Sequence, residues 1–239
     1  MRIYAIGDMH LEGGTGKTMD CFGDNWRDHD RKIFEAWERL GSDDDLLLIV
    51  GDTSWAMRIE DALPDLDRIG KMKGLKLLLK GNHDYWWQSA SKMARVLHPS
   101  IRTLNAGSVI EGRTAIAGTR GWVCPNDSSF GEHDAKIYER EVGRLRAALQ
   151  SLRGREAEFD SLIVALHYPP MNDKHEPSGF TELVDEYGAD FCVFGHVHGE
   201  HIKSVFTGKR GRTIYSLVSA DAVNFTPAEV KATEFRGSA

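Results

Sequence analysis

Five short apolar runs, each followed at once by a segment rich in glycine, aspartate, asparagine or histidine, constrain the fold of this chain more than any other feature. The runs are Ile3–Ile6, Leu46–Val50, Leu75–Leu79, Leu162–Leu166 and Phe191–Phe194. Apolar runs of this length are typical of strands buried on both faces, as in an α/β sheet. The sequence therefore predicts an α/β fold in which these runs are strands of a mixed sheet system.

Segments with helical periodicity lie between the apolar runs. Apolar residues that share one helical face predict helices over residues 33–40, 63–72, 137–152 and 180–187. Gly188 follows the last of these segments, and glycine is favoured just past the C-terminus of a helix.

The remaining segments predict two hairpins and one long loop. Ser108–Ile110 pairs with Thr114–Ala117 in the first expected hairpin, and His201–Phe206 pairs with Thr213–Val218 in the second. The segment Leu11–Asp30 is rich in glycine and aspartate and is too long for a simple connection. We expect this segment to be either a functional flap or partly mobile.

Composition limits the possible classes of function. The chain has 36 acidic and 30 basic residues and a formal net charge of −6, which disfavours nucleic-acid binding by a broad basic surface. Its three cysteines, Cys21, Cys124 and Cys192, are odd in number and widely spaced, as expected in a reducing compartment. No apolar stretch resembles a signal peptide or approaches the roughly 18 residues of a membrane span. We expect a single cytoplasmic domain over residues 1–239, with no membrane segment.

Polar residues at the ends of the five runs are the candidates for chemistry. In order along the chain they are Asp8, His10, Asp52, Asn82, His83, His167, His196 and His198. Ligands of open α/β sheets bind at the carboxyl ends of the strands, which is where all of these residues fall. Residues two apart in an extended segment face the same way, so Asp8 with His10, and His196 with His198, can each bind one centre.

These residue types predict a site for two metal ions. Carboxylate, imidazole and amide ligands without thiolate suit Mn²⁺, Fe, Zn²⁺ or Ni²⁺, and are too rich in nitrogen for Ca²⁺ or a simple Mg²⁺ site. A closed structural zinc site uses four ligands, fewer than the candidates present here. Taken singly, a Gly-Asp pair or a histidine is more often a turn or a hydrogen-bonding core residue. The ordered placement of the whole set favours two ions about 3.5–4 Å apart, sharing a bridging carboxylate and clamping a phosphoryl group.

The same blocks resemble a known family. Gly7-Asp8-x-His10, Gly51-Asp52, Gly81-Asn82-His83-Asp84, His167 and Gly195-His196-x-His198 match in order the signature of the calcineurin-like metallophosphoesterase superfamily. The resemblance implies a four-layer α/β/β/α sandwich with two central mixed sheets.

The resemblance also implies a role for each block residue. One ion would be bound by Asp8, His10 and His198, the other by Asn82, His167 and His196, with Asp52 bridging the two. A hydroxide held between the ions would attack phosphorus. His83 would contact the phosphoryl oxygen and protonate the leaving alkoxide. It would act as the general acid because it is the only block histidine that is not used as a ligand.

The sequence departs from two branches of that superfamily. Protein Ser/Thr phosphatases resemble Gly-Asp-x-x-Asp-Arg-Gly in the second block, whereas residues 51–57 read Gly-Asp-Thr-Ser-Trp-Ala-Met and lack the phosphate-binding arginine. Relatives that act on lipid A precursors tend to carry arginine at the position of His83. Both differences argue against those substrates, and Asp84 is left as a possible orienting partner of His83.

Several residues outside the blocks have open interpretations. Arg120 is either a clamp for a second phosphate or carboxylate of the substrate, or a surface arginine in a turn. Trp55 and the aromatic segment 85–87 either stack on substrate or pack in the core, and core packing is favoured for Trp87. Residues 13–18 resemble a P-loop, but the required first glycine falls on Leu11, so we expect a glycine-rich flap instead.

The predicted function is a dinuclear metal-dependent phosphoesterase. The missing phosphatase arginine favours a phosphodiester of a small molecule, such as a nucleotide derivative. A nuclease acting on DNA or RNA is the first alternative, and the net charge counts against it. A non-catalytic metal-binding scaffold is the second, and the presence of both Asp52 and His83 counts against it.

Overall fold

Two mixed sheets form the centre of the molecule in the computed structural model, which describes residues 1–231 except for the side chain of Cys21. The first sheet has the strand order β11-β1-β2-β3-β4, and the second β5-β6-β7-β8-β10-β9. The strands of the first sheet are β1 (Ile3–Ile6), β2 (Leu46–Val50), β3 (Leu75–Leu79), β4 (Ile101–Leu104) and β11 (Ala228–Glu229). Those of the second are β5 (Gly107–Glu111), β6 (Thr114–Thr119), β7 (Ser161–Leu166), β8 (Phe191–Phe194), β9 (Gly208–Arg210) and β10 (Thr213–Leu217).

All five predicted apolar strands are confirmed, as β1, β2, β3, β7 and β8. They are parallel to their strand neighbours within each sheet, except where β11 pairs antiparallel with β1. Alternate residues of each strand face two different cores: Ile3 and Ala5 face the other sheet, whereas Tyr4 and Ile6 face helices. Burial on both faces explains why these strands are apolar without alternation.

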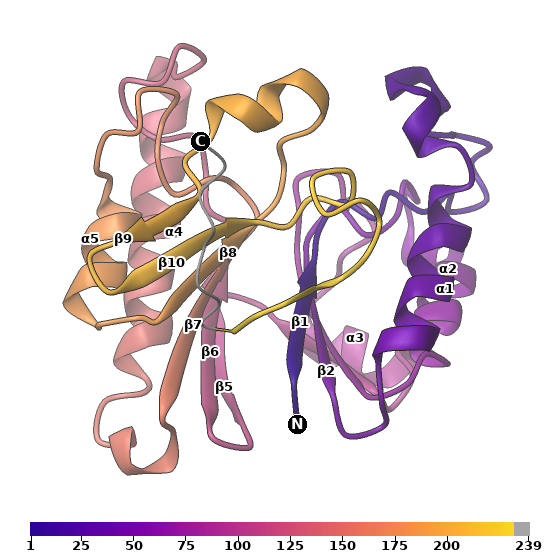
Figure 1. Cartoon of the computed structure of the whole chain (residues 1–239), viewed down its shortest axis with the longest axis horizontal. Coiled ribbons are helices and arrows are strands. Elements are labelled where there is room, and N and C mark those ends of the chain that lie inside the picture. Colours follow the sequence, from indigo (N-terminus) through magenta and orange to yellow (C-terminus); the bar gives the residue numbers. More distant parts are fainter. Residues whose placement is uncertain (232–239) are drawn as a thin grey trace.

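Helices cover the outer face of each sheet, giving the predicted four-layer sandwich (Figure 1). The helices are α1 (His29–Leu40), α2 (Ile59–Gly70), α3 (Ala90–Val96), α4 (Glu132–Gln150) and α5 (Gly179–Glu186). The first three pack on the first sheet through side chains such as Trp37, Leu66 and Met93. The last two pack on the second sheet through side chains such as Leu145 and Phe180. The four predicted helices are confirmed, whereas α3 was not predicted because Met93 is its only buried apolar residue.

The first predicted hairpin is confirmed as β5 and β6, but the second was placed wrongly. Residues 201–206 lie in a 3₁₀ helix, Gly199–Ser204, and the loop after it, and β10 pairs instead with β9. The apolar residues Ile202, Val205 and Phe206 pack against the core of the second sheet from this helix and loop. β9 itself, Gly-Lys-Arg, is a half-exposed edge strand without an apolar pattern that could have identified it.

One charged residue lies inside the predicted apolar run of β3. Lys76 is fully buried, and its Nζ donates hydrogen bonds to the carbonyls of Gly70, Met72 and Gly74 at 2.5–3.1 Å. These carbonyls follow the end of α2, where cations are favoured by the helix dipole. Burial lowers the pKa of Lys76 to about 8. The hydrogen bonds of Lys76 thus connect the C-terminal end of α2 to β3.

The described part of the chain also bears on the predicted extent of the domain. Within residues 1–231, no helix is both long enough and apolar enough to cross a membrane. The predicted domain of residues 1–239 includes residues 232–239, which lie outside the described residues.

Candidate metal centre

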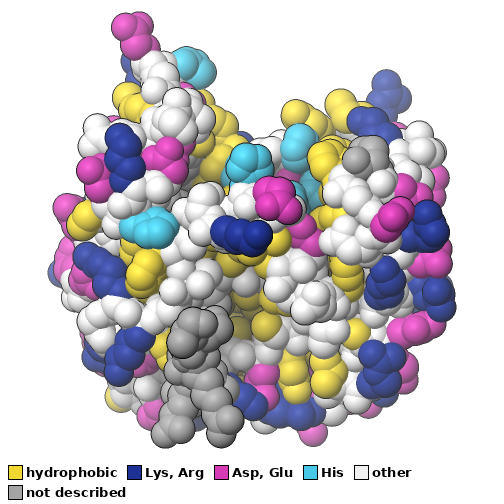
Figure 2. Space-filling view, turned by 45° about the horizontal axis from the view of Figure 1, so that its top comes forward, with side chains coloured by type: hydrophobic (Ala, Val, Ile, Leu, Met, Phe, Trp, Pro, Cys, Tyr) yellow, Lys and Arg dark blue, Asp and Glu magenta, His cyan; other side chains and the backbone are white. Residues whose placement is uncertain are grey.

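The carboxyl ends of β1, β2, β3, β7 and β8 meet at one end of the sandwich (Figure 1). Backbone hydrogen bonds join the two sheets there: Gly7 N donates to Val218 O at 2.7 Å and lies in a parallel bridge with Ser219. In the space-filling view, histidine side chains gather in a hollow between two raised parts of the surface (Figure 2). All of the block residues predicted from the sequence lie at this end.

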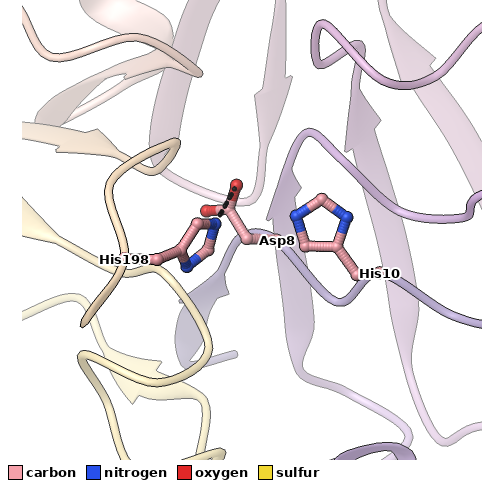
Figure 3. A group of neighbouring side chains, drawn as sticks. All are labelled: Asp8, His10 and His198. Atoms are coloured by element: carbon pink, nitrogen blue, oxygen red, sulfur yellow. Dashed lines mark ion pairs between the residues drawn. The ribbon is translucent and has the colours of Figure 1, made fainter. Parts of the chain in front are cut away.

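Two groups of side chains could each hold a metal ion. One consists of Asp8, His10 and His198, and we call it the first cluster (Figure 3). The other, the second cluster, consists of Asp52, His167 and His196. Within each cluster the three potential ligand atoms all lie within 4.8 Å of one another. The first cluster has the three residues that the resemblance implies for one ion, and the second has two of the three implied for the other, His167 and His196, together with Asp52.

Asp52 lies between the clusters. Its Oδ2 is 3.5 Å from His167 Nε2 in the second cluster and 3.8 Å from His10 Nε2 in the first. Its other oxygen, Oδ1, accepts a hydrogen bond from the backbone N–H of His83 at 2.8 Å. One carboxylate oxygen therefore faces ligands of both clusters, while the other is held by the backbone.

Asn82 joins the second cluster through His167. The Oδ1 of Asn82 is 2.6 Å from His167 Nε2, so these two atoms are close enough together to bind the same cation. The other ring nitrogen, Nδ1, lies 3.0 Å from the Val50 carbonyl, which accepts its proton. In the tautomer that donates Nδ1–H to Val50, Nε2 is unprotonated and free to bind a cation.

His198 of the first cluster is held by a carboxylate that the sequence did not single out. His198 Nδ1 is 3.0 Å from Asp221 Oδ1, and Asp221 Oδ2 accepts from Gly199 N at 2.8 Å. His198 Nε2 faces Asp8 Oδ1 at 3.4 Å. Asp221 follows β10 in a turn, after a strand that no sequence motif connected with the site, so no signal marked it.

Buried atoms of the first cluster lack protein partners. Asp8 is fully buried, and its Oδ1 accepts no hydrogen bond from the described residues, while Oδ2 accepts from His196 N at 2.9 Å. His10 Nδ1 is likewise buried without a partner among the described residues. A buried carboxylate oxygen without a partner is costly, and a bound cation would remove that cost. The donor set of nitrogen and oxygen atoms fits a transition-metal ion.

The electrostatics of the clusters also favour cations. Burial, reinforced by the charge of Asp8, raises the pKa of Asp52 to about 8. Burial lowers the pKa of His10 to about 3 and that of His196 to about 3, so both rings are neutral and able to act as ligands. Burial also lowers the pKa of His198, but the hydrogen bond to Asp221 and the nearby carboxylate of Asp8 outweigh it and raise this pKa to about 10.

Backbone strain falls on the ligand residues more than on the glycines. Asp8, His10, Asp52 and His196 have φ values of 57°, 42°, 49° and 76°, in the left-handed region that side chains rarely adopt. Of the glycines that precede block residues, Gly7, Gly51, Gly81 and Gly195, only Gly51 has a positive φ, 98°.

The glycines are instead required by close packing. A side chain at Gly81 would collide with Asp52 Oδ1, and one at Gly195 would collide with Asp8 Oδ2. At Gly51 an added Cβ would lie 2.6 Å from His167 Nδ1. Each of these glycines makes room for a candidate ligand that belongs to a different block of the sequence.

His83 stands at the edge of both clusters. It is half-buried, and its ring lies 5.8 Å from the ring of His10 and 4.8 Å from that of Trp55. Burial and the nearby His167 lower its pKa. An anionic phosphoryl group beside the imidazole would raise that pKa again, because negative charge favours the protonated ring.

Asp84 does not orient His83. It is fully buried and accepts hydrogen bonds from the backbone N–H groups of Thr53 and Gly81 at 2.8 and 2.7 Å and from Trp86 Nε1 at 3.0 Å. Burial and the charge of Asp52 raise its pKa to about 6. Asp84 therefore connects the second and third blocks through its hydrogen bonds and is not the orienting partner of His83.

The aromatic residues near the blocks divide into two groups. Trp86 and Trp87 are buried in the core beneath the first sheet's helices, which confirms the core interpretation of Trp87. Trp55 instead stacks on His10 at 4.5 Å, and Tyr85 is 59% exposed beside His83. Tyr85 is therefore the exposed aromatic side chain beside His83, whereas the ring of Trp55 is already packed against His10.

The segment Leu11–Asp30, expected to be a flap, packs against the first cluster through Trp26. It contains two short 3₁₀ helices, Asp20–Phe22 and Asp24–Trp26. Trp26 is buried, 5.4 Å from the ring of His198. Residues 13–16 of the P-loop-like segment form turns, no α-helix follows directly, and Lys17 Nζ lies 5.2 Å over the ring of Trp55. The P-loop interpretation is therefore excluded by the backbone.

The layered fold and the paired clusters together define a metal-dependent phosphoesterase. The family model of the calcineurin-like phosphoesterases matches residues 1–200, and the chain belongs to this family. No curated protein matches the sequence of the chain.

Solved structures with the same fold are distant in sequence. Phosphopantetheinyl hydrolase from Mycobacterium tuberculosis is 14% identical with a TM-score of 0.59, over 100% of this chain and 98% of that one. A Thermus thermophilus protein is 15% identical with a TM-score of 0.55, over 90% and 87%. A purple acid phosphatase from yellow lupin seeds is 16% identical with a TM-score of 0.50, over 100% of this chain but 46% of its own. At these identities the likeness supports the shared fold alone.

Proposed function

We propose that the chain is a dinuclear phosphodiesterase that acts on small phosphorylated molecules, including nucleotide-derived diesters. The observation that carries this proposal is the position of Asp52, whose Oδ2 lies within 4 Å of a histidine from each cluster. A carboxylate in this position is what two neighbouring ions require. Asp8, His10 and His198 would hold one ion, and Asn82, His167 and His196 the other, with Asp52 shared.

The bound ions and the surrounding side chains would divide the chemistry between them. Two bound ions supply charge neutralisation at the phosphoryl oxygens and a hydroxide nucleophile near neutral pH. The backbone and buried carboxylates of the chain fix the ligands, so little reorganisation accompanies binding. His83 donates a hydrogen bond to a phosphoryl oxygen and gives a proton to the leaving alkoxide, and is left free for this by the use of Asn82 as the neighbouring ligand.

The preference for small diesters rests on what surrounds His83. The second block lacks the arginine that grips a phosphomonoester in protein phosphatases. Tyr85 instead offers an exposed aromatic face to an organic group, and stacking on such a face contributes about 1–3 kcal/mol per base. The net charge of −6 disfavours long nucleic acids.

A substrate panel tests the proposal. The protein is loaded in turn with Mn²⁺, Ni²⁺, Zn²⁺ and Mg²⁺ and assayed on 4-nitrophenyl phosphate, bis(4-nitrophenyl) phosphate and single-stranded DNA. We expect the diester to have the highest kcat/KM, with a transition metal rather than Mg²⁺. A higher kcat/KM for the monoester would reject the diester preference, and cleavage of DNA with a steep salt dependence would favour a nuclease.

Two further features of the chain belong to the proposal. A single domain over residues 1–239 is supported by a family match that spans both sheets and by the apolar core that the sheets share. A cytoplasmic location is supported by Cys124 and Cys192, which are buried free thiols. Fractionation of cells that express the protein would test the location.

A further inference from the structure

A small basic pocket adjoins the second cluster. It lies where β3, β4 and β6 end, next to the strand ends that carry the candidate ligands. The cavity has a volume of about 200 Å³, which is large enough for a phosphate group. It is lined by Lys80, Arg120, Arg140, Arg144 and Glu141, together with uncharged residues at the ends of the three strands.

The charges in this pocket do not balance. Glu141 is fully buried and accepts hydrogen bonds from Thr119 Oγ1 at 2.5 Å and from Arg144 at 2.7 Å. Arg140 Nε lies 3.5 Å from the same carboxylate. One carboxylate therefore faces two arginines, which leaves the pocket with a positive charge in a chain whose net charge is −6.

The two remaining cations have no acidic partner. Among residues 1–231, neither Lys80 nor Arg120 forms an ion pair or a side-chain hydrogen bond, although both side chains are half-buried. The guanidinium of Arg120 instead packs on the ring of Trp122, with its Cζ 4.5 Å from the ring centroid. Partly desolvated cations without partners attract anions strongly, and a guanidinium matches the geometry of a phosphoryl group.

Both cations are connected to the metal centre through the backbone. Lys80 lies two residues before Asn82. The carbonyl of Arg120 accepts hydrogen bonds from the N–H groups of His167 and Tyr168, both at 3.0 Å. Tyr168 in turn packs on the ring of His196 at 4.0 Å. An anion in the pocket would therefore lie beside the second cluster without occupying it.

We propose that this pocket binds a second phosphoryl group of the substrate, so that the substrate class is small phosphoesters that carry another phosphate. Lys80 and Arg120 are the specificity-determining residues. This inference rests on the proposed function for the reaction itself, but the anion site can be tested without any turnover.

The kinetic test uses two substrates that differ only in the second phosphate. They are thymidine 5′-(4-nitrophenyl phosphate) and its 3′-phosphorylated analogue, assayed with the Mn²⁺-loaded protein. We expect the 3′-phosphate to raise kcat/KM roughly 10- to 100-fold, the range of charge-assisted hydrogen bonds. Lys80→Gln and Arg120→Gln should each reduce this preference, and the double variant should abolish it.

The control is Arg39→Gln, which removes one positive charge from an exposed position on α1. It should leave the preference intact. No preference in the wild-type protein, or a preference that survives in the double variant, would overturn the proposal. So would a loss of equal size in the Arg39→Gln control, since the effect would then reflect net charge alone.

A binding measurement separates this proposal from the proposed function. Titration calorimetry with inorganic pyrophosphate on the metal-free protein should show one site that the double variant lacks. Binding without hydrolysis of either ester would reject the diesterase and retain the anion site. Unchanged pyrophosphate binding by the double variant would reject the pocket, whatever the activity.

Discussion

The two clusters use the same kinds of ligand but are supported differently. In the first cluster, His198 is held by the carboxylate of Asp221 and faces Asp8. In the second, His167 is held by the neutral carbonyl of Val50 and faces the neutral amide of Asn82. Anionic support makes an imidazole a stronger ligand than neutral support does. The difference teaches that the two sites are not equivalent, and we expect the first cluster to bind its ion more tightly.

Asp52→Asn should have the largest effect on the two sites, because Asp52 faces both clusters. We expect the metal content to fall from two ions per chain to one, retained by the first cluster, and the activity to fall by about 10⁴-fold, since several kcal/mol of charge stabilisation are lost. Elemental analysis of the reconstituted protein and kcat/KM check both. Asp44→Asn, at an exposed position, is the control. Two ions retained in Asp52→Asn would contradict the bridging role.

His83→Ala tests a residue that belongs to neither cluster. Loss of the general acid should lower kcat roughly 10²- to 10⁴-fold. Metal content should stay at two ions per chain, because the backbone N–H that holds Asp52 remains. His133→Ala replaces an exposed histidine and should change neither quantity. Full activity in His83→Ala would remove His83 from the mechanism.

Asp221→Asn sharpens the comparison, because among residues 1–231 a carboxylate that supports a ligand histidine is found at the first cluster and not at the second. Loss of the carboxylate should weaken binding of one ion about 10- to 100-fold and leave the other unchanged. Competition with a fluorescent chelator gives the two affinities separately, and Asp221→Ala should show a larger effect than Asp221→Asn. Equal weakening of both ions would show that the turn carrying Asp221 supports the whole site.

Metal removal gives the smallest effect, a change of a few degrees in Tm. Between pH 6.5 and 8 the metal-free folded state retains protons on Asp52, whose pKa is raised to about 8, and on His198, whose pKa is raised to about 10. The unfolded state has fewer protons on these two groups in that range. Above about pH 7.5, where His10 and His196 are neutral in both states, the metal-free protein should therefore become less stable as pH rises. Binding of the ions requires the loss of the protons on Asp52 and His198. The difference in Tm between loaded and chelated protein should grow from pH 6.5 to 8. A constant difference would contradict the raised pKa values.

The strands and most helices could be predicted because burial on two faces leaves a simple apolar pattern. The candidate ligands could be found because each follows such a strand directly. Asp221 could not be found, since it reaches His198 across 23 positions of the sequence through a turn that follows another strand. The β9 strand could not be predicted because it is a short, half-exposed edge strand without an apolar pattern. The role of Lys76 could not be predicted because its hydrogen bonds go to backbone carbonyls, which no residue type marks in the sequence.

The close approach of glycines to ligands has a consequence for how this site can be changed. Gly81 limits the space of Asp52, Gly195 that of Asp8, and Gly51 that of His167. A side chain introduced at a glycine of one block would therefore displace a ligand that belongs to another block. Variants made one position at a time will mostly fail, whereas libraries that vary each glycine together with the ligand it contacts can reach new metal sites on the same scaffold.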